Sequence, residues 1–323
     1  MPVWEGMMKD SLNRNIDYLR VSLTDRCNLR CIYCQPDRVD NEKMDLLSAN
    51  EIEKLVSVGV ALGVRKVRLT GGEPLTRPDI LDITSRVSRF GVELTLTTNG
   101  LLLAPIALEL KKSGLKRVNI SLDTLEPEKY RAMTRGGDIE KVFESIEVAE
   151  HSGLTPIKIN VVPIRGINDD EIEDFARLTY EKNYHIRFIE LMPNAHFKED
   201  KKRIGKEELL NRLRNLGQLM LLPFKGRGPS RNYRFKGAKG VIGLISPISD
   251  CFCKYCNRLR ITSRGTIRPC LFSDTEIDIK TPLRNNATTK ELTTLFLEAV
   301  RIKPEGHSIP NAQTLPSMSK IGG

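Results

Sequence analysis

The sequence predicts an α/β protein, an incomplete barrel of six βα units followed by a C-terminal α+β extension. Up to residue 192, short apolar strand patterns alternate with amphipathic helix patterns, and strict alternation implies a parallel sheet with right-handed crossovers. Six units are too few for the closed eight-fold barrel, which takes about 250 residues. The alternation stops near residue 200, so we expect a barrel domain at 1–200 and an extension that covers its open side at 201–323.

Each unit has local signals for its strand and its helix. The six strands are expected at 18–23, 64–70, 92–98, 116–123, 156–163 and 186–192. The helices between them are expected at 48–62, 78–90, 103–113, 138–152 and 168–183. Ser48 with Glu51 and Asn168 with Glu171 have capping-box spacing, and Pro78 suits a first helical turn. In the extension we expect a basic helix at 205–215, short strands at 219–223, 232–235 and 240–245, and a last helix near 289–300.

Composition narrows the class of protein. No run of about 18 apolar residues occurs and the N-terminus lacks the features of a signal peptide, so we expect a cytoplasmic protein that does not enter a membrane. In that compartment the seven cysteines are more often metal ligands than disulfides. Residues 201–240 hold 12 Lys/Arg against 2 Asp/Glu, which fits either a solvated surface or one that meets a polyphosphate. Aromatic residues are sparse there, which argues against nucleic acid as a partner.

Three closely spaced cysteines follow the first predicted strand. Cys27, Cys31 and Cys34 have C-x3-C-x2-C spacing and lie where α/β proteins usually place their chemistry, at the carboxyl end of a strand. Three thiolates would leave one iron of a [4Fe–4S] cluster open to another ligand. Half of a zinc site and buried thiols that pack as small hydrophobes remain alternatives.

A second group of cysteines lies in the extension. Cys253, Cys256 and Cys270 have C-x2-C-x13-C spacing and again offer three thiolates. Cys251 could complete a structural zinc site, but we prefer a second cluster with an open iron and Cys251 spare. Arg258 and Arg260 are two residues apart and follow Cys256, so on a strand both side chains face the same side. Their guanidinium groups could bind phosphate oxygens, or they could simply be solvated.

Polar residues at other strand ends predict the rim of a site. Gly71-Gly72 would let the backbone approach a ligand closely. The strand residues Thr97 to Asn99, Asn119 to Ser121, Lys158 and Arg187 to Met192 are expected to point to one rim.

These motifs carry a resemblance to a known family. The strand before Cys27, the aromatic Tyr33 and the Gly71-Gly-Glu-Pro segment resemble the radical S-adenosylmethionine (SAM) enzymes. With the addition of Thr97-Thr-Asn-Gly, Cys253-x2-Cys256-Asn-Arg-Leu-Arg, Cys270-Leu-Phe and the terminal Gly-Gly, the chain resembles nearly end to end the GTP 3′,8-cyclases. That radical SAM family begins molybdenum cofactor (molybdopterin) biosynthesis.

The resemblance implies two [4Fe–4S] clusters and a reaction. Cys27, Cys31 and Cys34 would hold the cluster that binds SAM and cleaves it to a 5′-deoxyadenosyl radical. Cys253, Cys256 and Cys270 would hold the second, whose open iron binds the guanine end of GTP. The radical would take hydrogen from C3′ of the ribose, and C3′ would then attack C8 of guanine, which yields 3′,8-cyclo-7,8-dihydro-GTP after reduction.

The resemblance also implies contacts, residue by residue. Those with SAM are expected from Tyr33, Gly72, Ser121 and Met192, with Glu73 or a backbone carbonyl accepting from its amino group. Contacts with GTP are expected from Arg20, Arg68, Thr97, Lys158, Arg258, Arg260 and the terminal Gly322 and Gly323. Lys66 and Leu259 are expected beside them, Lys66 as one of the cations that offset the charge of the triphosphate. Of these, Arg258 and Arg260 are counted with the catalytic set.

Partners and rival functions complete the expectations. The family implies an electron donor and a downstream cyclic pyranopterin monophosphate synthase, and the sequence leaves a homodimer open. Gln35 and Cys251 depart from the family pattern without touching a matched ligand. The rivals are another radical SAM enzyme with an auxiliary cluster, such as a peptide-modifying one, an RNA-binding protein with a zinc knuckle, and an electron carrier.

Overall fold

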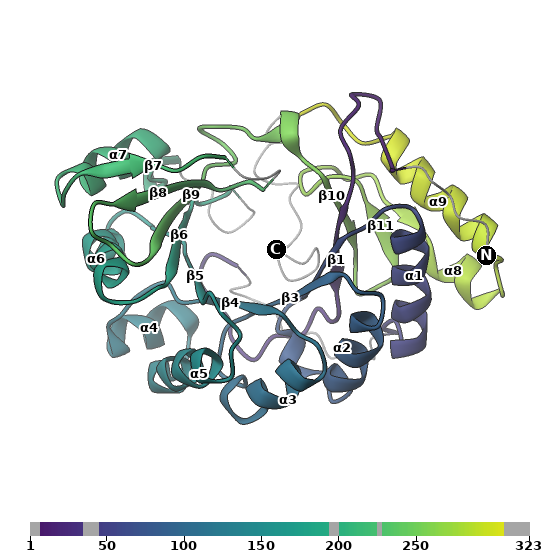
Figure 1. Ribbon diagram of the computed structural model, residues 1–323, viewed down its shortest axis with the longest axis horizontal. Coiled ribbons are helices and arrows are strands. Elements are labelled where there is room, and N and C mark those ends of the chain that lie inside the picture. Colours follow the sequence, from purple (N-terminus) through teal and green to yellow (C-terminus); the bar gives the residue numbers. More distant parts are fainter. Residues whose placement is uncertain (1–6, 35–44, 194–199, 225–227, 307–323) are drawn as a thin grey trace.

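The computed structural model describes residues 7–34, 45–193, 200–224 and 228–306 (Figure 1). In this part of the chain the strands form an open arc, and the helices of the first half lie along its outer side (Figure 1). The arrangement confirms the predicted α/β fold with an incomplete barrel.

Six parallel strands form the centre of the sheet, in chain order. They are β1 (Tyr18–Ser22), β2 (Lys66–Thr70), β3 (Glu93–Thr98), β4 (Arg117–Ser121), β5 (Lys158–Val161) and β6 (His185–Ile189). Their residues are mostly buried, as expected for a parallel sheet whose apolar face needs a cover of helices. All six predicted strands are confirmed, with bounds shifted by a few residues.

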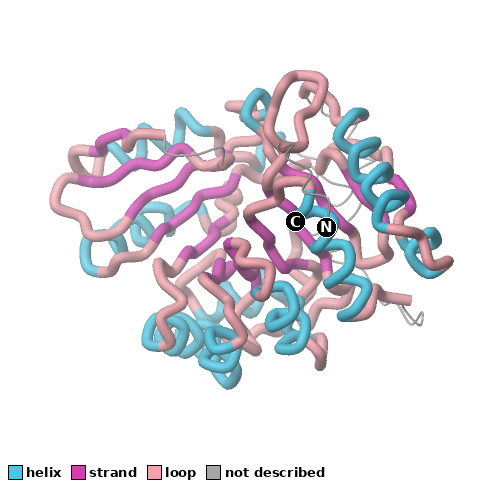
Figure 2. The backbone as a smooth tube through the Cα atoms, turned by 45° about the vertical axis from the view of Figure 1, so that its right-hand side comes forward, coloured by secondary structure: helices cyan, strands magenta, loops and turns pink. Residues whose placement is uncertain are grey.

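Helices connect these strands and cover the outside of the arc (Figure 2). They are α1 (Ala49–Ala61), α2 (Ile80–Ser88), α3 (Ala107–Lys112), α4 (Pro127–Thr134), α5 (Ile139–His151) and α6 (Ile172–Glu181). The Ser48–Glu51 capping box is confirmed at the start of α1. One expected bound was wrong, because α2 begins at Ile80 after Asp79 rather than at Pro78. The helix α4 was not predicted. Short 3₁₀ turns occur at η1 (Pro74–Thr76), η2 (Ala104–Ile106), η3 (Asp169–Glu171), η4 (Asp200–Lys202) and η5 (Cys253–Tyr255).

The C-terminal third continues the same sheet at both of its edges. Next to β1 lies β10 (Arg258–Ile261), parallel to it, followed by β11 (Thr266–Arg268) and β12 (Ile277–Asp278). Next to β6 lies β9 (Val241–Ile245), also parallel, followed by β8 (Arg231–Phe235) and β7 (Leu219–Leu221). Strands from both sides of residue 200 therefore share one sheet, and the domain boundary there stays a prediction.

Three helices accompany these strands: α7 (Lys206–Arg214), α8 (Lys280–Arg284) and α9 (Thr289–Arg301). Of these, α9 packs on α1, where the fully buried ring of Phe296 lies against Gly59. Apolar side chains from sheet and helices form a continuous core. The C-terminal third is thus bonded to the barrel through strand pairing and through this helix contact.

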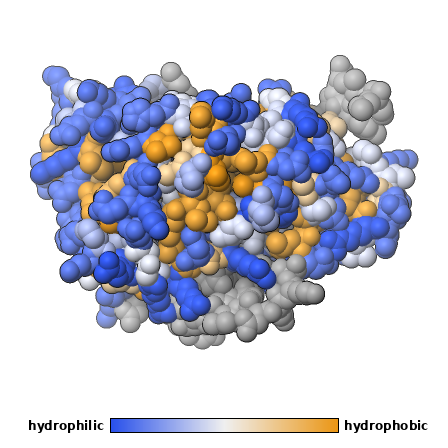
Figure 3. All heavy atoms as spheres, turned by 90° about the horizontal axis from the view of Figure 1, so that it is seen from below, coloured by the Kyte–Doolittle hydropathy of each residue, from blue (hydrophilic) through white to orange (hydrophobic). Residues whose placement is uncertain are grey.

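The outer surface carries both apolar and hydrophilic side chains. In the view from below, apolar residues gather in the middle of the face and hydrophilic ones surround them (Figure 3). Exposed apolar side chains of this kind are normal on folded proteins. None of the helices in the described ranges has the length and apolar character needed to cross a membrane.

We expect Phe296→Ala to lower the free energy of unfolding by about 3 to 5 kcal/mol, because it leaves a cavity between α9 and α1. Urea unfolding of the metal-free protein would measure it. The neighbouring Leu297 is 45% exposed, so Leu297→Ala is the control, with an expected loss below about 1 kcal/mol. Equal losses in the two variants would contradict the packing described for α9.

Candidate active site

The loop that carries Cys27, Cys31 and Cys34, here the N-terminal cysteine set, follows the carboxyl end of β1. Backbone hydrogen bonds fasten it to the end of α4: Arg30 N donates to Thr134 O (3.1 Å) and Ile32 N donates to Met133 O (2.9 Å). Cys34 N donates to Cys31 O (3.0 Å), which closes a turn between those two thiols. The unpredicted helix α4 therefore holds the loop in place.

The side chain of Tyr33 provides a further attachment for this loop. Its hydroxyl donates to Asp123 Oδ2 (2.7 Å), and Asp123 Oδ1 accepts from Val162 N (2.8 Å). Burial raises the pKa of Asp123 to about 6. Asp123 thus links the cysteine loop to the segments that follow β4 and β5.

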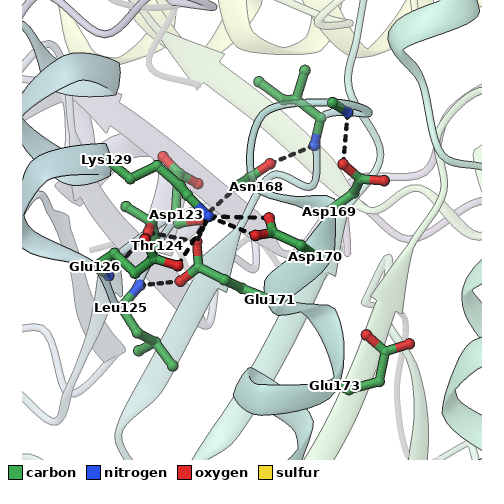
Figure 4. A network of polar contacts seen from close by, with 12 residues as sticks. Asp123, Thr124, Leu125, Glu126, Lys129, Asn168, Asp169, Asp170, Glu171 and Glu173 are labelled. Carbon is green, nitrogen blue, oxygen red and sulfur yellow. Dashed lines mark hydrogen bonds and ion pairs between the residues drawn. The ribbon is translucent and has the colours of Figure 1, made fainter.

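Asp123 belongs to a larger network of polar contacts (Figure 4). Asn168 Nδ2 donates to Asp123 O (2.6 Å), and its Oδ1 accepts from Ile164 N (2.7 Å). Glu171 accepts from Thr124 Oγ1 and Leu125 N, both at 2.6 Å. The predicted capping box of Asn168 and Glu171 was therefore wrong: Asn168 makes no side-chain cap, because both side chains bind neighbouring loops instead.

Glycines allow the loop after β2 to approach the cysteine loop. Gly72 N donates to Thr24 O (2.7 Å) and Glu73 N donates to Arg26 O (2.7 Å). A Cβ at Gly72 would lie 2.2 Å from Arg26 O. Any residue other than glycine would therefore require a shift of the backbone at this position. The close approach that we expected for a ligand is here made by the chain itself.

The carboxylate of Glu73 is engaged within the protein. It accepts hydrogen bonds from Leu75 N (3.0 Å), Thr98 Oγ1 (2.9 Å) and Asn99 N (2.7 Å). Asn99 in turn donates to Asn28 Oδ1 (2.7 Å) and lies 3.8 Å from Cys27 Sγ. Of the two acceptors expected for the amino group of SAM, this favours a backbone carbonyl over Glu73.

The second group, Cys253, Cys256 and Cys270, here the C-terminal cysteine set, lies at the other end of the strands. In the parallel pairing of β1 with β10, Tyr18 is opposite Arg258, so Cys256 precedes the amino end of β10 while Cys27 follows the carboxyl end of β1. A strand of five residues spans about 17 Å. The two cysteine sets are therefore separated by roughly the length of β1.

The donor atoms suit iron–sulfur clusters better than a mononuclear metal. All six cysteines of the two sets are half-buried, whereas Cys251 is exposed. Within the ranges that the structure describes, no three His, Cys, Asp or Glu side chains converge as the ligands of one metal ion would. A cubane cluster needs no such convergence, because each thiolate binds a different iron, whereas tetrahedral zinc does need it.

A cavity of about 860 Å³ extends along the inner side of the sheet and is lined by the C-terminal cysteine set. Nine Lys or Arg and only two Asp or Glu belong to its described lining. The basic residues are Arg20, Arg65, Lys66, Arg68, Arg187, Arg234, Arg258, Arg260 and Lys303. Such a wall favours an anionic ligand.

The pKa values of several buried cations in and near this cavity are lowered. Burial, together with neighbouring cations, lowers the pKa of Arg20 to about 10 and that of Arg187 to about 9. Burial and the nearby guanidinium groups of Arg187 and Arg117 lower the pKa of Lys158 to about 6. Buried positive charges with too few counter-ions are unfavourable, and an anion in the cavity would relieve this cost.

Buried oxygen atoms without partners point to a polar ligand as well. Thr97 Oγ1, Asn160 Oδ1 and Asn257 Oδ1 have no hydrogen-bond partner within the described chain, and their residues line the cavity. Buried polar atoms nearly always find a partner. A ligand with many hydrogen-bonding groups could provide one for each.

The structure places most of the expected GTP contacts together. Arg20, Lys66, Arg68, Thr97, Arg258 and Arg260 line the cavity, as does Met192 of the expected SAM contacts. The expectation that Lys158 points to the carboxyl rim was wrong, because it is the first residue of β5 and lies at the amino end. Leu259 packs in the core, so only its backbone could meet a nucleotide.

The remaining expected residues lie elsewhere. Tyr33, Gly72 and Ser121 are outside the cavity lining, toward the N-terminal cysteine set, and Gly322 and Gly323 are outside the described residues. Sequence reasoning placed Arg187 only on the rim and missed it as a cavity cation. Its third position in β6, on the same face as His185 and Ile189, was the available signal.

Two basic residues of the segment 201–240 form ion pairs within the described chain. On α7, Lys206 pairs with Asp250 (2.8 Å) and Arg212 pairs with Glu173 (2.6 Å). Of this segment only Arg234 is among the described basic residues of the cavity lining. A solvated, ion-paired surface therefore fits this segment better than a phosphate site.

Known family patterns and known proteins match this chain over nearly its whole length. The radical SAM superfamily pattern matches residues 21–179, and the pattern named Molybdenum Cofactor Synthesis C matches residues 184–309. A GTP 3′,8-cyclase of Thermodesulfovibrio yellowstonii is 48% identical over 98% of this chain and 100% of that protein. One of Moorella thermoacetica is 46% identical with the same coverage.

A solved structure shows the same fold at low sequence identity. Streptococcus suis SuiB, bound to its precursor peptide SuiA, aligns with a TM-score of 0.64 and 16% identity over 91% of this chain and 67% of SuiB. At that identity the likeness concerns the fold alone.

The carboxylate of Glu73 gives a pH-dependent prediction. Burial raises its pKa from 4.5 to about 7, so the folded state binds an extra proton between these values and the stability that Glu73 contributes falls as pH rises through that window. Glu73→Gln cannot titrate, so its cost in unfolding free energy should be larger at pH 5 than at pH 7.5, by up to about 3 kcal/mol. Urea unfolding of the metal-free protein at several pH values would measure this difference. The exposed Glu109→Gln is the control, and a cost of Glu73→Gln that rises with pH would contradict the prediction.

Proposed function

The chain belongs to the GTP 3′,8-cyclases of molybdenum cofactor biosynthesis, a radical SAM family with an auxiliary cluster, and on that premise we propose how its residues divide the reaction. GTP occupies the cavity, with its guanine toward the C-terminal cysteine set and its ribose toward the N-terminal set. The single observation that supports this placement most strongly is the row of buried cations between two cysteine sets at opposite ends of β1 and β10.

In this proposal the two sets hold one [4Fe–4S] cluster each. Cys27, Cys31 and Cys34 leave one iron for SAM, and Cys253, Cys256 and Cys270 leave one for the substrate. When bound, the first cluster with SAM supplies the 5′-deoxyadenosyl radical, and the second holds the base of GTP. The chain itself positions the reactants and keeps water and stray hydrogen donors away.

The residues near the N-terminal set fix where SAM binds. Asp123 and the end of α4 hold the loop, and Gly72 brings the strand β2 turn against it. We assign contacts with SAM to Tyr33, Gly72, Ser121 and Met192. Of these, Met192 lies in the cavity lining and marks the side on which SAM and GTP would meet.

The cations along the cavity bind and orient GTP. A triphosphate carries about four negative charges, and charge-assisted hydrogen bonds from arginine forks are strong in a buried site. We assign Arg20, Lys66, Arg68 and Arg187 of the cavity lining to the anionic groups, and Thr97 to a hydroxyl or phosphate oxygen. Lys158 is outside the described lining, at the amino end of β5, and is proposed as a further contact on the basis of the family alone.

Arg258 and Arg260 have a special place, since β10 starts beside Cys256. They alternate on this strand on both sides of the buried Leu259, so both forks reach the cavity lining. We assign them to the guanine end of the substrate, where they would hold C8 within reach of C3′. The terminal Gly322 and Gly323 are proposed as further contacts on the basis of the family alone.

Several wider assignments accompany this function. We propose a cytoplasmic location, an external electron donor and transfer of the product to a cyclic pyranopterin monophosphate synthase. A homodimer is a further proposal.

Iron and acid-labile sulfide per chain, after anaerobic reconstitution, test the two clusters. We expect about eight irons in the parent and about four in Cys253→Ala/Cys256→Ala/Cys270→Ala, because each set holds its own cluster. Cys251→Ala is the matched control and should keep the parent value, since that thiol is exposed and spare. About four irons with one zinc in the parent would overturn the second cluster.

Arg187→Met tests the role of the cavity cations in substrate binding. Loss of one buried charge-assisted contact should weaken GTP binding about 10- to 100-fold and leave the iron content unchanged. Anaerobic calorimetric titration with GTP measures the affinity. The exposed Arg214→Met on α7 is the control, and equal affinities of the two variants would remove Arg187 from the binding site.

A further inference from the structure

Two buried cations from distant parts of the chain hold the backbone around the C-terminal cysteine set. Arg14 Nη1 donates to Cys253 O (2.8 Å), and Lys303 Nζ donates to Arg258 O (2.8 Å) and Pro269 O (2.6 Å). One of these carbonyls belongs to Cys253 itself, one lies two residues after Cys256, and one directly precedes Cys270. Each cysteine of this set is thus fastened within two residues of its position.

Arg14 is itself fixed by the turn before β1. Its Nε donates to Asp10 Oδ2 (2.5 Å), and Asp10 Oδ1 accepts from Arg14 N (2.9 Å). Its fork also donates to Pro304 O (2.7 Å) and Glu305 O (3.1 Å). One buried guanidinium, 8% exposed, therefore joins the N-terminal turn, the Cys253 turn and the segment after α9.

Lys303 follows the end of α9 and is 4% exposed. Within the described ranges it forms no ion pair with a carboxylate, and its two hydrogen bonds go to carbonyl oxygens. Burial lowers the pKa of Lys303, whereas the nearby thiols of Cys256 and Cys270 act to raise it. A buried ammonium group without a carboxylate is costly unless another negative group is close, and thiolates around a metal cluster are such a group.

The backbone at these cysteines receives support from outside the local turns. The segments around Cys253 and Cys270 lie outside the strands, and buried carbonyls require a donor. Cys253 O accepts from Cys256 N (3.0 Å) within its turn and from Arg14 as a second donor, and Pro269 O accepts from Lys303. Groups that orient the ligands of a metal site strongly affect how firmly it is held. The geometry therefore gives both cations a role in the spacing of the three thiols.

We propose that Arg14 and Lys303 are positioning residues for the second cluster, which they support by clamping the three cysteine segments to the N-terminal turn and to the end of α9. This inference rests on the proposed function, because it requires that Cys253, Cys256 and Cys270 hold a cluster. It assigns no contact with SAM or GTP to either residue.

The test uses a full-length background in which Cys27, Cys31 and Cys34 are all Ala, so that bound iron reports the second cluster alone. After anaerobic reconstitution, this background should hold about four irons. Adding Lys303→Met or Arg14→Met should speed the loss of iron to a chelator by about tenfold or more and change the electron paramagnetic resonance signal of the reduced cluster. Arg14→Lys keeps the charge but loses the fork, so an intermediate rate is expected. Lys290→Met, an exposed lysine on α9, is the matched control.

The same substitutions in the chain with all its cysteines show whether the protein still folds. There Lys303→Met and Arg14→Lys should keep the irons of the N-terminal set. Iron loss from both sets would mean that the residues support folding in general, which would overturn the inference. So would release at the rate of Lys290→Met with an unchanged resonance signal, while the background still holds its cluster. A background that binds no iron at all would instead overturn the second cluster, and the inference with it.

Discussion

The parallel pairing of β1 with β10 is the constraint on which the site depends. It joins the beginning and the last third of the chain in one sheet, with Tyr18 opposite Arg258 and Arg20 opposite Arg260. Because the strands run the same way, one cysteine set follows a carboxyl end and the other precedes an amino end. The cavity is lined by the C-terminal set, and the N-terminal set lies about one strand length away from it.

The charges of the cavity lining also favour the binding of an anion in the cavity. The inner side of the sheet gathers cations from β1, β2, β6 and β10, and few carboxylates balance them. Folding can tolerate this because the core and helix packing lie on the outer side of the sheet, where α9 packs on α1. The resulting site is destabilised by its own charge and gains the most when a polyanion binds.

The loops that carry the thiols are held by side chains far from them in sequence. Tyr33 reaches Asp123, Asn99 reaches Asn28, and Asp25 accepts from Ser263 of the β10–β11 turn. These contacts connect the N-terminal cysteine loop to the barrel and to the C-terminal third. The backbone of the N-terminal cysteine loop is therefore already fixed before a ligand binds there, which lowers the ordering cost of association.

The sequence by itself determined the alternation of strands and helices, the cysteine spacings and the family, because hydrophobic period and ligand spacing are local properties. It also predicted most of the basic residues of the cavity. Tertiary structure alone decided that Lys158 lies at the amino end of β5, that Asn168 and Glu171 bind loops rather than cap α6, and that Glu73 is engaged by Thr98 and Asn99. It likewise brought Arg14 and Lys303 to the C-terminal cysteine set. Such contacts join residues far apart in the chain, and they depend on strand register and packing, which a local pattern does not encode.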